Sequence, residues 1–155
     1  NHQEKGIFKG FSAYYSHNTY VAEVAKIRLE AGQLKIEKVD CAVDCGILVN
    51  PLGAINQIQG GIIDGMGHAL YGDFTFKDGR PQSSNFNNYR LIRMMESPEQ
   101  IDVHFVESDN DPTGLGEPSL PPAGGALANA LFAATNIRFY RQPFAKQLVE
   151  IEKNI

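Results

Sequence analysis

The first fifty residues alternate apolar and polar positions with a period of two, which is the pattern of half-buried β-strands. Three stretches carry it: residues 7–15, 19–29 and 34–43. The turn-forming pair His17-Asn18 separates the first two stretches. Glu30-Ala31-Gly32-Gln33 separates the second from the third, and Gly32 suits the positive φ of a hairpin turn. We therefore expect three strands joined by two hairpins.

After Asn50-Pro51 the period changes to that of a helix. Apolar residues then recur every three or four positions, at Ile55, Ile58, Ile62, Met66 and Leu70. Five glycines interrupt this stretch: Gly53, Gly60, Gly61, Gly65 and Gly67. Each costs about 1 kcal/mol in a helix interior relative to alanine. A helix with so many glycines needs a compensating reason, normally the close approach of another backbone or of a ligand.

The second half of the chain predicts shorter elements. A strand with a tight turn is expected over 74–80, loop with extended pieces over 83–95, and a strand over 101–106. Pro121-Pro122 can open a helix whose buried stripe is Leu127, Leu131 and Ala134, and Asn136 is a suitable end. The tail is expected to pack through four residues: Phe139, Tyr140, Phe144 and Leu148.

This order of elements predicts an α+β fold, with an antiparallel or mixed sheet and two main helices packed on one side. The length of 155 residues suits a single compact unit over 1–155. A division into lobes 1–50 and 51–155 is the alternative, because the hydrophobic period changes at that boundary.

The composition is that of an ordinary soluble domain, with 43% hydrophobic and 21% charged residues and a formal net charge of -4. No cluster of Lys or Arg indicates a nucleic-acid or membrane surface, and no apolar run is long enough to span a membrane. Cys41 and Cys45 are too few for a zinc or iron–sulfur site. On one strand they would lie about 13 Å apart, which excludes a disulfide, so we expect structural thiols.

Two segments could carry chemistry. Gln57, Gly61, Asp64 and His68 fall on one face of the glycine-rich helix, near its start. Such a face can accept a flat or phosphate-bearing ligand, or its glycines can serve the close packing of another element. The second segment is Gly114-Leu115-Gly116-Glu117-Pro118, between a strand and a helix.

Glu117 is the candidate base in that second segment. A φ-locked proline follows it, so its carboxylate sits on a constrained loop. If the carboxylate is buried, loss of solvent strengthens it as a general base; otherwise it is a surface residue on a turn. Residues 84–89 could line a pocket or form Asx turns. Asp109-Asn110-Asp111 lacks the spacing of an EF-hand.

Taken together, these segments resemble the molybdopterin-binding subunit of the xanthine dehydrogenase/aldehyde oxidase family. The likeness is greatest to the isoquinoline 1-oxidoreductase beta-subunit type. Each matching string is weak alone, but the strings occur in family order across nearly the whole chain: residues 20–25, 39–46, 49–51, 57–61, 84–86, 114–118, 121–122 and 128–130. The chain matches only the C-terminal part of such subunits.

The resemblance implies an oxidoreductase that hydroxylates an aldehyde or an N-heterocycle with water as the oxygen source. Glu117 would be the catalytic base. Gln57, Gly60 and Gly61 would contact the cofactor, and Gly114 and Gly116 would shape the loop around it. The cofactor would be molybdopterin, as the cytosine dinucleotide, with molybdenum and no protein ligand to the metal.

The resemblance also implies partners that this chain lacks. These are the rest of the large subunit and an iron–sulfur small subunit with 2Fe-2S clusters, or another electron acceptor. The bacterial compartment stays open between cytoplasm and periplasm, and the 155-residue chain alone should hold no cofactor. Two alternatives remain: a non-catalytic cofactor-binding or assembly module of the same fold, and a hydrolase pairing Glu117 with Asp109 or Asp111.

Overall fold

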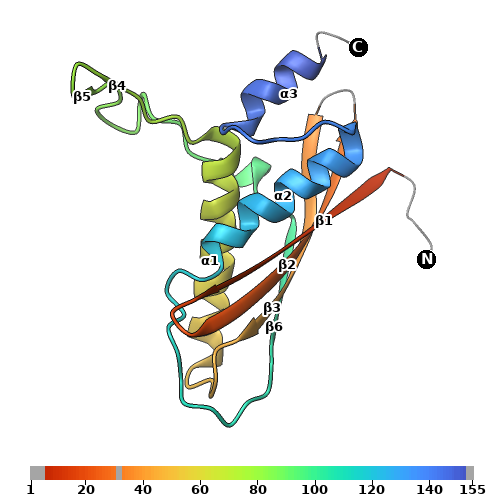
Figure 1. The fold of residues 1–155 in the computed structure, drawn as a ribbon, viewed down its shortest axis with the longest axis vertical. Helices are drawn as coiled ribbons and strands as arrows, with labels where there is room; N and C mark the ends of the chain where they lie inside the picture. Colours follow the sequence, from red (N-terminus) through yellow and green to blue (C-terminus); the bar gives the residue numbers. More distant parts are fainter. Residues whose placement is uncertain (1–5, 31–32, 153–155) are drawn as a thin grey trace.

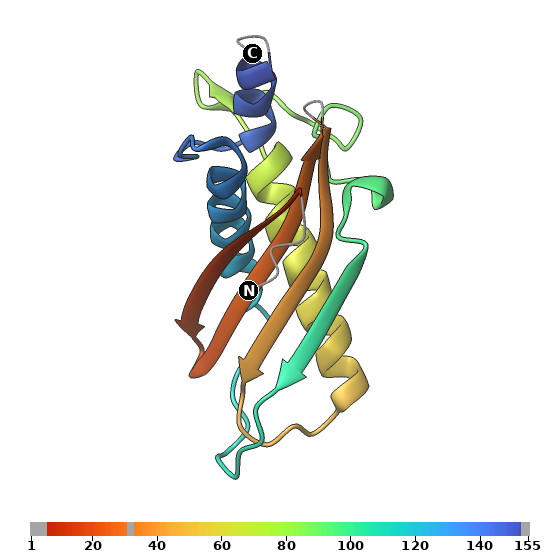
Figure 2. The ribbon, with the colours of Figure 1, turned by 90° about the vertical axis from the view of Figure 1, so that its right-hand side faces the viewer.

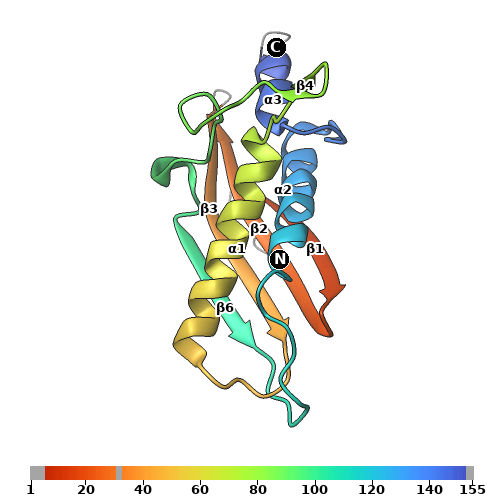
Figure 3. The ribbon, with the colours of Figure 1, turned by 90° about the vertical axis from the view of Figure 1, so that its left-hand side faces the viewer.

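Helices cover one face of a four-stranded sheet, and the opposite face carries no helix (Figures 2 and 3). The structure is a computed structural model, and it describes residues 6–30 and 33–152. The predicted α+β fold, with a mixed sheet and two main helices, is confirmed (Figure 1).

The sheet has the strand order β1-β2-β3-β6. Its strands are β1 (Ile7–Ser16), β2 (Thr19–Glu30), β3 (Gln33–Asp44) and β6 (Gln100–Phe105). The first three are antiparallel, and β6 pairs in parallel with β3. All four predicted strands are confirmed, while Ala31 and Gly32 of the second turn lie outside the described residues.

The β1–β2 turn uses two left-handed residues. His17 has φ 54° and Asn18 has φ 60°. Two positive φ values in a two-residue loop match the right-handed twist of the flanking strands. The predicted turn is therefore confirmed, and its tightness fixes where residues 17 to 19 lie.

A β-bulge changes which side chains of β3 are buried. Ile27 pairs with Ile36 and Lys26 pairs with Lys38, so Glu37 is the extra residue. Ile36 therefore faces the core from an even position, whereas Val39, Cys41 and Val43 face it from odd ones. Strict alternation through this strand was the wrong expectation, because one inserted residue reverses the side-chain parity.

Three helices and a small hairpin complete the fold. They are α1 (Pro51–Tyr71), α2 (Leu120–Thr135), α3 (Phe144–Glu152), and the hairpin of β4 (Phe76–Lys77) with β5 (Arg80–Pro81), with a 3₁₀ turn η1 (Met94–Glu96). The Asn50 side chain caps α1 by accepting the amide of Gly53, and the left-handed Asn136 ends α2 as predicted. In the tail, Phe139, Phe144 and Leu148 are buried as expected, but Tyr140 is 86% exposed.

The helix α2 lies directly on the backbone of β1. A methyl group added at Gly10 would stand 2.1 Å from the carbonyl oxygen of Ala126 and from the amide nitrogen of Ala130. Only glycine permits that approach. The core between the layers is apolar and mixes both halves of the sequence, with Val39, Ile62 and Leu127 fully buried.

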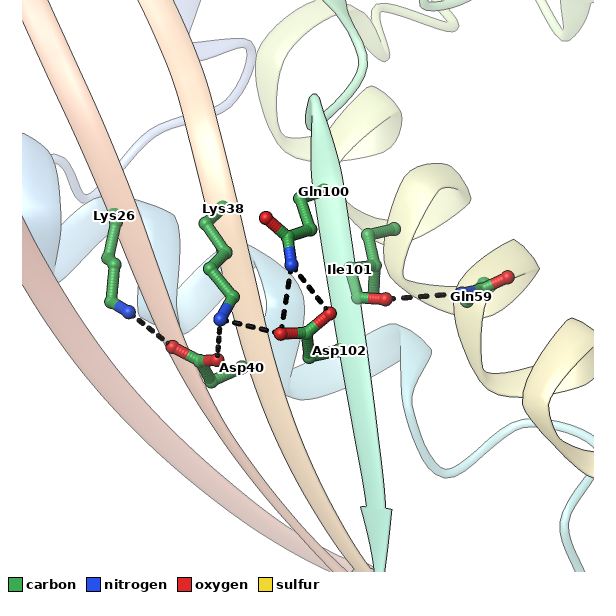
Figure 4. A network of polar contacts seen from close by, with 7 residues as sticks. All are labelled: Lys26, Lys38, Asp40, Gln59, Gln100, Ile101 and Asp102. Carbon is green, nitrogen blue, oxygen red and sulfur yellow. Dashed lines mark hydrogen bonds and ion pairs between the residues drawn. The ribbon is translucent and has the colours of Figure 1, made fainter.

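A ladder of charges crosses the helix-free face of the sheet (Figure 4). Asp40 on β3 accepts from Lys26 at 2.6 Å and from Lys38 at 2.7 Å. Lys38 also reaches Asp102 on β6 at 2.6 Å, and that bond lowers the pKa of the Asp102 carboxyl. On the other side of β6, Gln59 of α1 donates to the carbonyl oxygen of Ile101 at 3.1 Å. The short edge strand is thereby held by both its neighbours.

Both cysteines are free and buried, as expected of structural thiols. Burial raises the pKa of each thiol, so both stay protonated at neutral pH. Within residues 6–30 and 33–152, no helix combines the length and the apolar character that a bilayer crossing needs.

Glu23 is an unexpected member of the core. It lies on the helix-facing side of β2, between Ser12 of β1 and Cys41 of β3 in the strand register, and is 0% exposed. Neither carboxyl oxygen has a hydrogen-bond partner among the described residues. Burial raises the pKa of Glu23 from 4.5 to about 8, so the carboxyl group is protonated in the folded chain at neutral pH.

Glu23→Gln is expected to flatten the dependence of stability on pH. The folded protein binds a proton that the unfolded chain releases above pH 4.5, so rising pH costs stability until about pH 8. At pH 7 the cost is about 3 kcal/mol. Urea unfolding of both proteins at pH 4.5, 7 and 8.5 measures this, and a constant difference between them across that range would contradict the burial argument.

Candidate functional site

Three connections meet at one end of the sheet (Figures 1 and 3). They are the β1–β2 turn, residues 45–50 between β3 and α1, and the loop 106–119 between β6 and α2. Backbone bonds join them: Ile47 N to Asn110 O at 2.9 Å, Thr113 N to Cys45 O at 3.0 Å, and Gly114 N to His17 O at 3.1 Å. The long loop is therefore fastened although it has no regular structure.

Glu117 projects from this loop into solvent. Its side chain is 80% exposed, and its nearest charged neighbour is His17, with 3.6 Å between Nε2 and Oε2. That distance is too long for a hydrogen bond, and the contact is an ion pair only when the imidazole is protonated. The burial considered from the sequence is not provided by this chain. Pro118, which follows, is buried, and Glu117 O accepts the amide of Leu120 at 3.0 Å.

Gln57 joins the two segments that the sequence singled out. From the first half of α1, its Nε2 donates to the carbonyl oxygen of Gly116 at 2.6 Å. The glycine-rich helix and the Glu117 loop therefore form one site, although 59 residues separate the two partners in the sequence.

The candidate glycines divide into two kinds. A methyl group added at Gly60 or at Gly116 would meet no atom within 4 Å. One added at Gly61 would lie 2.2 Å from Ser119 Oγ, and one added at Gly114 would lie 2.7 Å from His17 Cβ. Internal packing accounts for Gly61 and Gly114. Gly60 and Gly116 leave open backbone that a bound group could approach.

The polar face predicted on α1 is turned slightly from its expected direction. Gly60, Asp64 and His68 line a shallow groove against residues 89–92, whereas Gly61 packs against the start of α2. Asp64 Oδ1 and His68 Nε2 lie 3.6 Å apart, and both side chains are about half exposed.

The segment 84–89 forms Asx turns. Asn88 Oδ1 accepts the amides of Ser84 and Asn85, and Asn85 Oδ1 accepts the amide of Phe86. Of this segment, Tyr89 lines the groove beside α1. Side chains that satisfy their own backbone are the simpler of the two explanations offered by the sequence.

Two buried hydroxyl groups beside the loop carried no signal in the sequence. Thr19 Oγ1 lies 2.6 Å from Thr113 Oγ1 and donates to Gly114 O at 2.6 Å. Ser119 Oγ donates to Ile58 O at 3.2 Å. A threonine that opens a strand and a serine before a helix are common residues, so only the three-dimensional contacts reveal what they hold.

Chemically, the arrangement presents a solvent-facing carboxylate on a braced loop, beside two openings in the backbone. It can accept a proton from a molecule bound at the loop. Over the described ranges, no three His, Cys, Asp or Glu side chains gather in a way that could hold a metal ion.

A sequence profile described as the molybdopterin cofactor-binding domain matches residues 2–98. The chain belongs to this family. The match includes Gln57, Gly60 and Gly61. The open backbone at Gly60, and at Gly116 across the Gln57 bond, fits the approach of a large planar cofactor.

This molybdopterin cofactor-binding domain has longer relatives. A nicotinate dehydrogenase chain of Pseudomonas putida, named as a subunit, is 33% identical over 92% of the chain, which covers 12% of that protein. The beta chain of isoquinoline 1-oxidoreductase from Brevundimonas diminuta is 32% identical over 88% of the chain, or 18% of its own length. The aldehyde oxidoreductase structure from Desulfovibrio gigas superposes with a TM-score of 0.74 at 26% identity, over 87% of this chain and 15% of that one. The chain thus spans less than a fifth of each relative.

Gly60→Ala and Gly61→Ala should change stability in opposite directions. At Gly60 a methyl group meets open space, so better helix propensity should stabilise the domain by about 1 kcal/mol. At Gly61 it displaces Ser119 Oγ from its bond to Ile58 O, at a cost of about 1–3 kcal/mol. Chemical denaturation of the two variants measures both. Equal shifts would show that the packing at Ser119 does not explain Gly61.

Proposed function

We propose that this chain is the C-terminal part of a molybdenum hydroxylase large subunit, with Glu117 as its catalytic base. The enzyme would oxidatively hydroxylate an aldehyde or an N-heterocycle with water as the oxygen source. The observation that carries the proposal is the bond from Gln57 to Gly116, because it brings the cofactor-facing helix against the loop that presents Glu117. The names of the relatives, which include a nicotinate, an isoquinoline and an aldehyde enzyme, support the substrate classes.

Gln57, Gly60 and Gly116 are the residues of this chain that would lie against the cofactor. Gly61 and Gly114 would act indirectly, because their surroundings are filled by Ser119 and His17. When bound, a molybdopterin cofactor in its cytosine dinucleotide form would supply the metal that activates the oxygen nucleophile and accepts the electrons. The Gln57 amide has a carbonyl oxygen that is not used in its bond to Gly116 and can accept from a bound group.

Glu117 would take the proton from the attacking oxygen at one of its carboxyl oxygens. A carboxylate that is 80% exposed is a weak base at neutral pH, and a general base works best when its pKa is near the working pH. Water must therefore be excluded from Glu117 by something outside this chain. The remainder of the large subunit is the natural cover.

The exposed apolar side chains support such a cover. Met94 and Met95 are 91% and 94% exposed, and Val49 and Leu52, at the start of α1, are 80% and 77% exposed. Apolar groups so exposed indicate surfaces that another polypeptide buries. Beyond the large subunit, an iron–sulfur small subunit with 2Fe-2S clusters, or another acceptor, would remove the electrons; the names of the nicotinate and isoquinoline relatives mark them as subunits of larger assemblies.

In the complete large subunit, Glu117→Gln should lower kcat by about 10²–10⁴-fold while the cofactor stays bound. Glutamine keeps the size and the loop contacts but cannot accept the proton. Steady-state turnover and metal analysis of the same sample give the two readouts. Glu107→Gln, the same change elsewhere on the loop, is the control and should be near normal. Near-normal turnover of the Glu117 variant would refute the assignment.

Purified alone, the 155-residue chain is expected to retain no stoichiometric molybdenum. It offers one side of the site, and its candidate cofactor contacts are an amide and open backbone. Elemental analysis after expression in a host that makes molybdopterin tests this, with the complete large subunit as the positive control. One molybdenum per chain would show that the domain holds the cofactor unaided.

A further inference from the structure

We propose that Thr19 is a positioning residue, whose buried hydroxyl group fixes Gly114 and through it the place of Glu117. The inference rests on the proposed role of Glu117 as the base. Thr19 opens β2, lies on the helix-facing side of the sheet and is 0% exposed. It belongs to the rigid sheet, whereas Glu117 belongs to a loop without regular structure.

The hydrogen bonds at Thr19 have a defined direction. A threonine hydroxyl has one proton, and Thr19 donates it to Gly114 O at 2.6 Å. The 2.6 Å contact with Thr113 Oγ1 must then run the other way, with Thr113 as donor. Two consecutive loop residues, Thr113 and Gly114, are thus bound to one side chain of the sheet.

The turn before Thr19 holds Gly114 from a second direction. Gly114 N donates to His17 O at 3.1 Å, so both the amide and the carbonyl of Gly114 are bound to residues 17–19. The left-handed His17 and Asn18 make this turn tight, and His17 Cβ would lie 2.7 Å from a methyl group at Gly114. The end of the hairpin therefore acts as a clamp on Gly114, three residues before Glu117.

The helix layer holds the other side of the loop. Gln57 of α1 binds Gly116 O, and Ser119 Oγ binds Ile58 O of the same helix. Glu117 is therefore suspended between an anchor on the sheet and an anchor on α1. Removing the sheet anchor leaves the first half of the loop free to move, while the cofactor-facing side keeps its contacts. Catalysis should suffer through misplacement of the base, with substrate binding unchanged.

The test compares Thr19→Val, which removes only the hydroxyl group, with Thr19→Ser, which keeps it. In the 155-residue chain, Thr19→Val should raise amide hydrogen exchange at Gly114 about 10-fold and leave Ala25 in the middle of β2 unchanged. In the complete loaded enzyme it should lower kcat about 10-fold with little change in KM. Thr19→Ser should restore both values. Thr135→Val, which removes a hydroxyl bonded to Leu131 O at the far end of α2, should change neither.

Each failure has a distinct meaning. Exchange at Gly114 and kcat that both stay normal in Thr19→Val, with an inactive Glu117→Gln enzyme, would overturn the positioning role alone. An active Glu117→Gln enzyme would overturn the proposed function, whatever the Thr19 variants do. If Thr19→Val does not fold, Thr113→Val removes the same hydroxyl pair from the loop side and must raise exchange at Gly114; unchanged exchange there would also overturn the inference.

Discussion

The contact between α2 and β1 at Gly10 sets the geometry of the whole domain. Because the Ala126 carbonyl and the Ala130 amide stand where a Cβ of residue 10 would be, the helix lies at the smallest separation that a sheet allows. The first residue of α2 follows Glu117 by three positions, so the place of the helix fixes where the catalytic loop must end. The start of α2 in turn fills the space beside Gly61 and Gly65 of α1, which sets the spacing of the two helices.

Within that frame the site is assembled from segments far apart in the sequence. The sheet contributes the β1–β2 turn and Thr19, α1 contributes Gln57, and the loop contributes Glu117. A loop held from two layers can stay open to a cofactor and still keep its carboxylate in one place. The domain is thus suited to supply the base and one wall of a cofactor site, as its family and the length of its relatives indicate.

Much of this could be read from the sequence, and the limits have physical causes. Two-residue and helical periods predicted the strands and both main helices, and the ordered motifs indicated the family. The parity change at Glu37 was hidden, because a bulge adds one residue without any turn signal. Glu23 was missed because nothing local distinguishes a buried carboxyl from an exposed one in an alternating strand. The glycines of α1 needed coordinates, since packing and ligand approach call for the same residue; here Gly61 serves packing and Gly60 faces open space.

The ten residues of β1 have a consequence for handling the isolated chain. Among the described strands β1 pairs with β2 alone, so one side of its backbone has free amides and carbonyls. Phe11 and Tyr15 on this strand are 60% and 53% exposed. A long, aromatic edge strand is a template for pairing with another copy, and natural proteins usually protect such edges. Concentrated solutions of the domain alone are therefore prone to edge-to-edge aggregation, and a charged substitution at Phe11 is the simplest way to keep it monomeric.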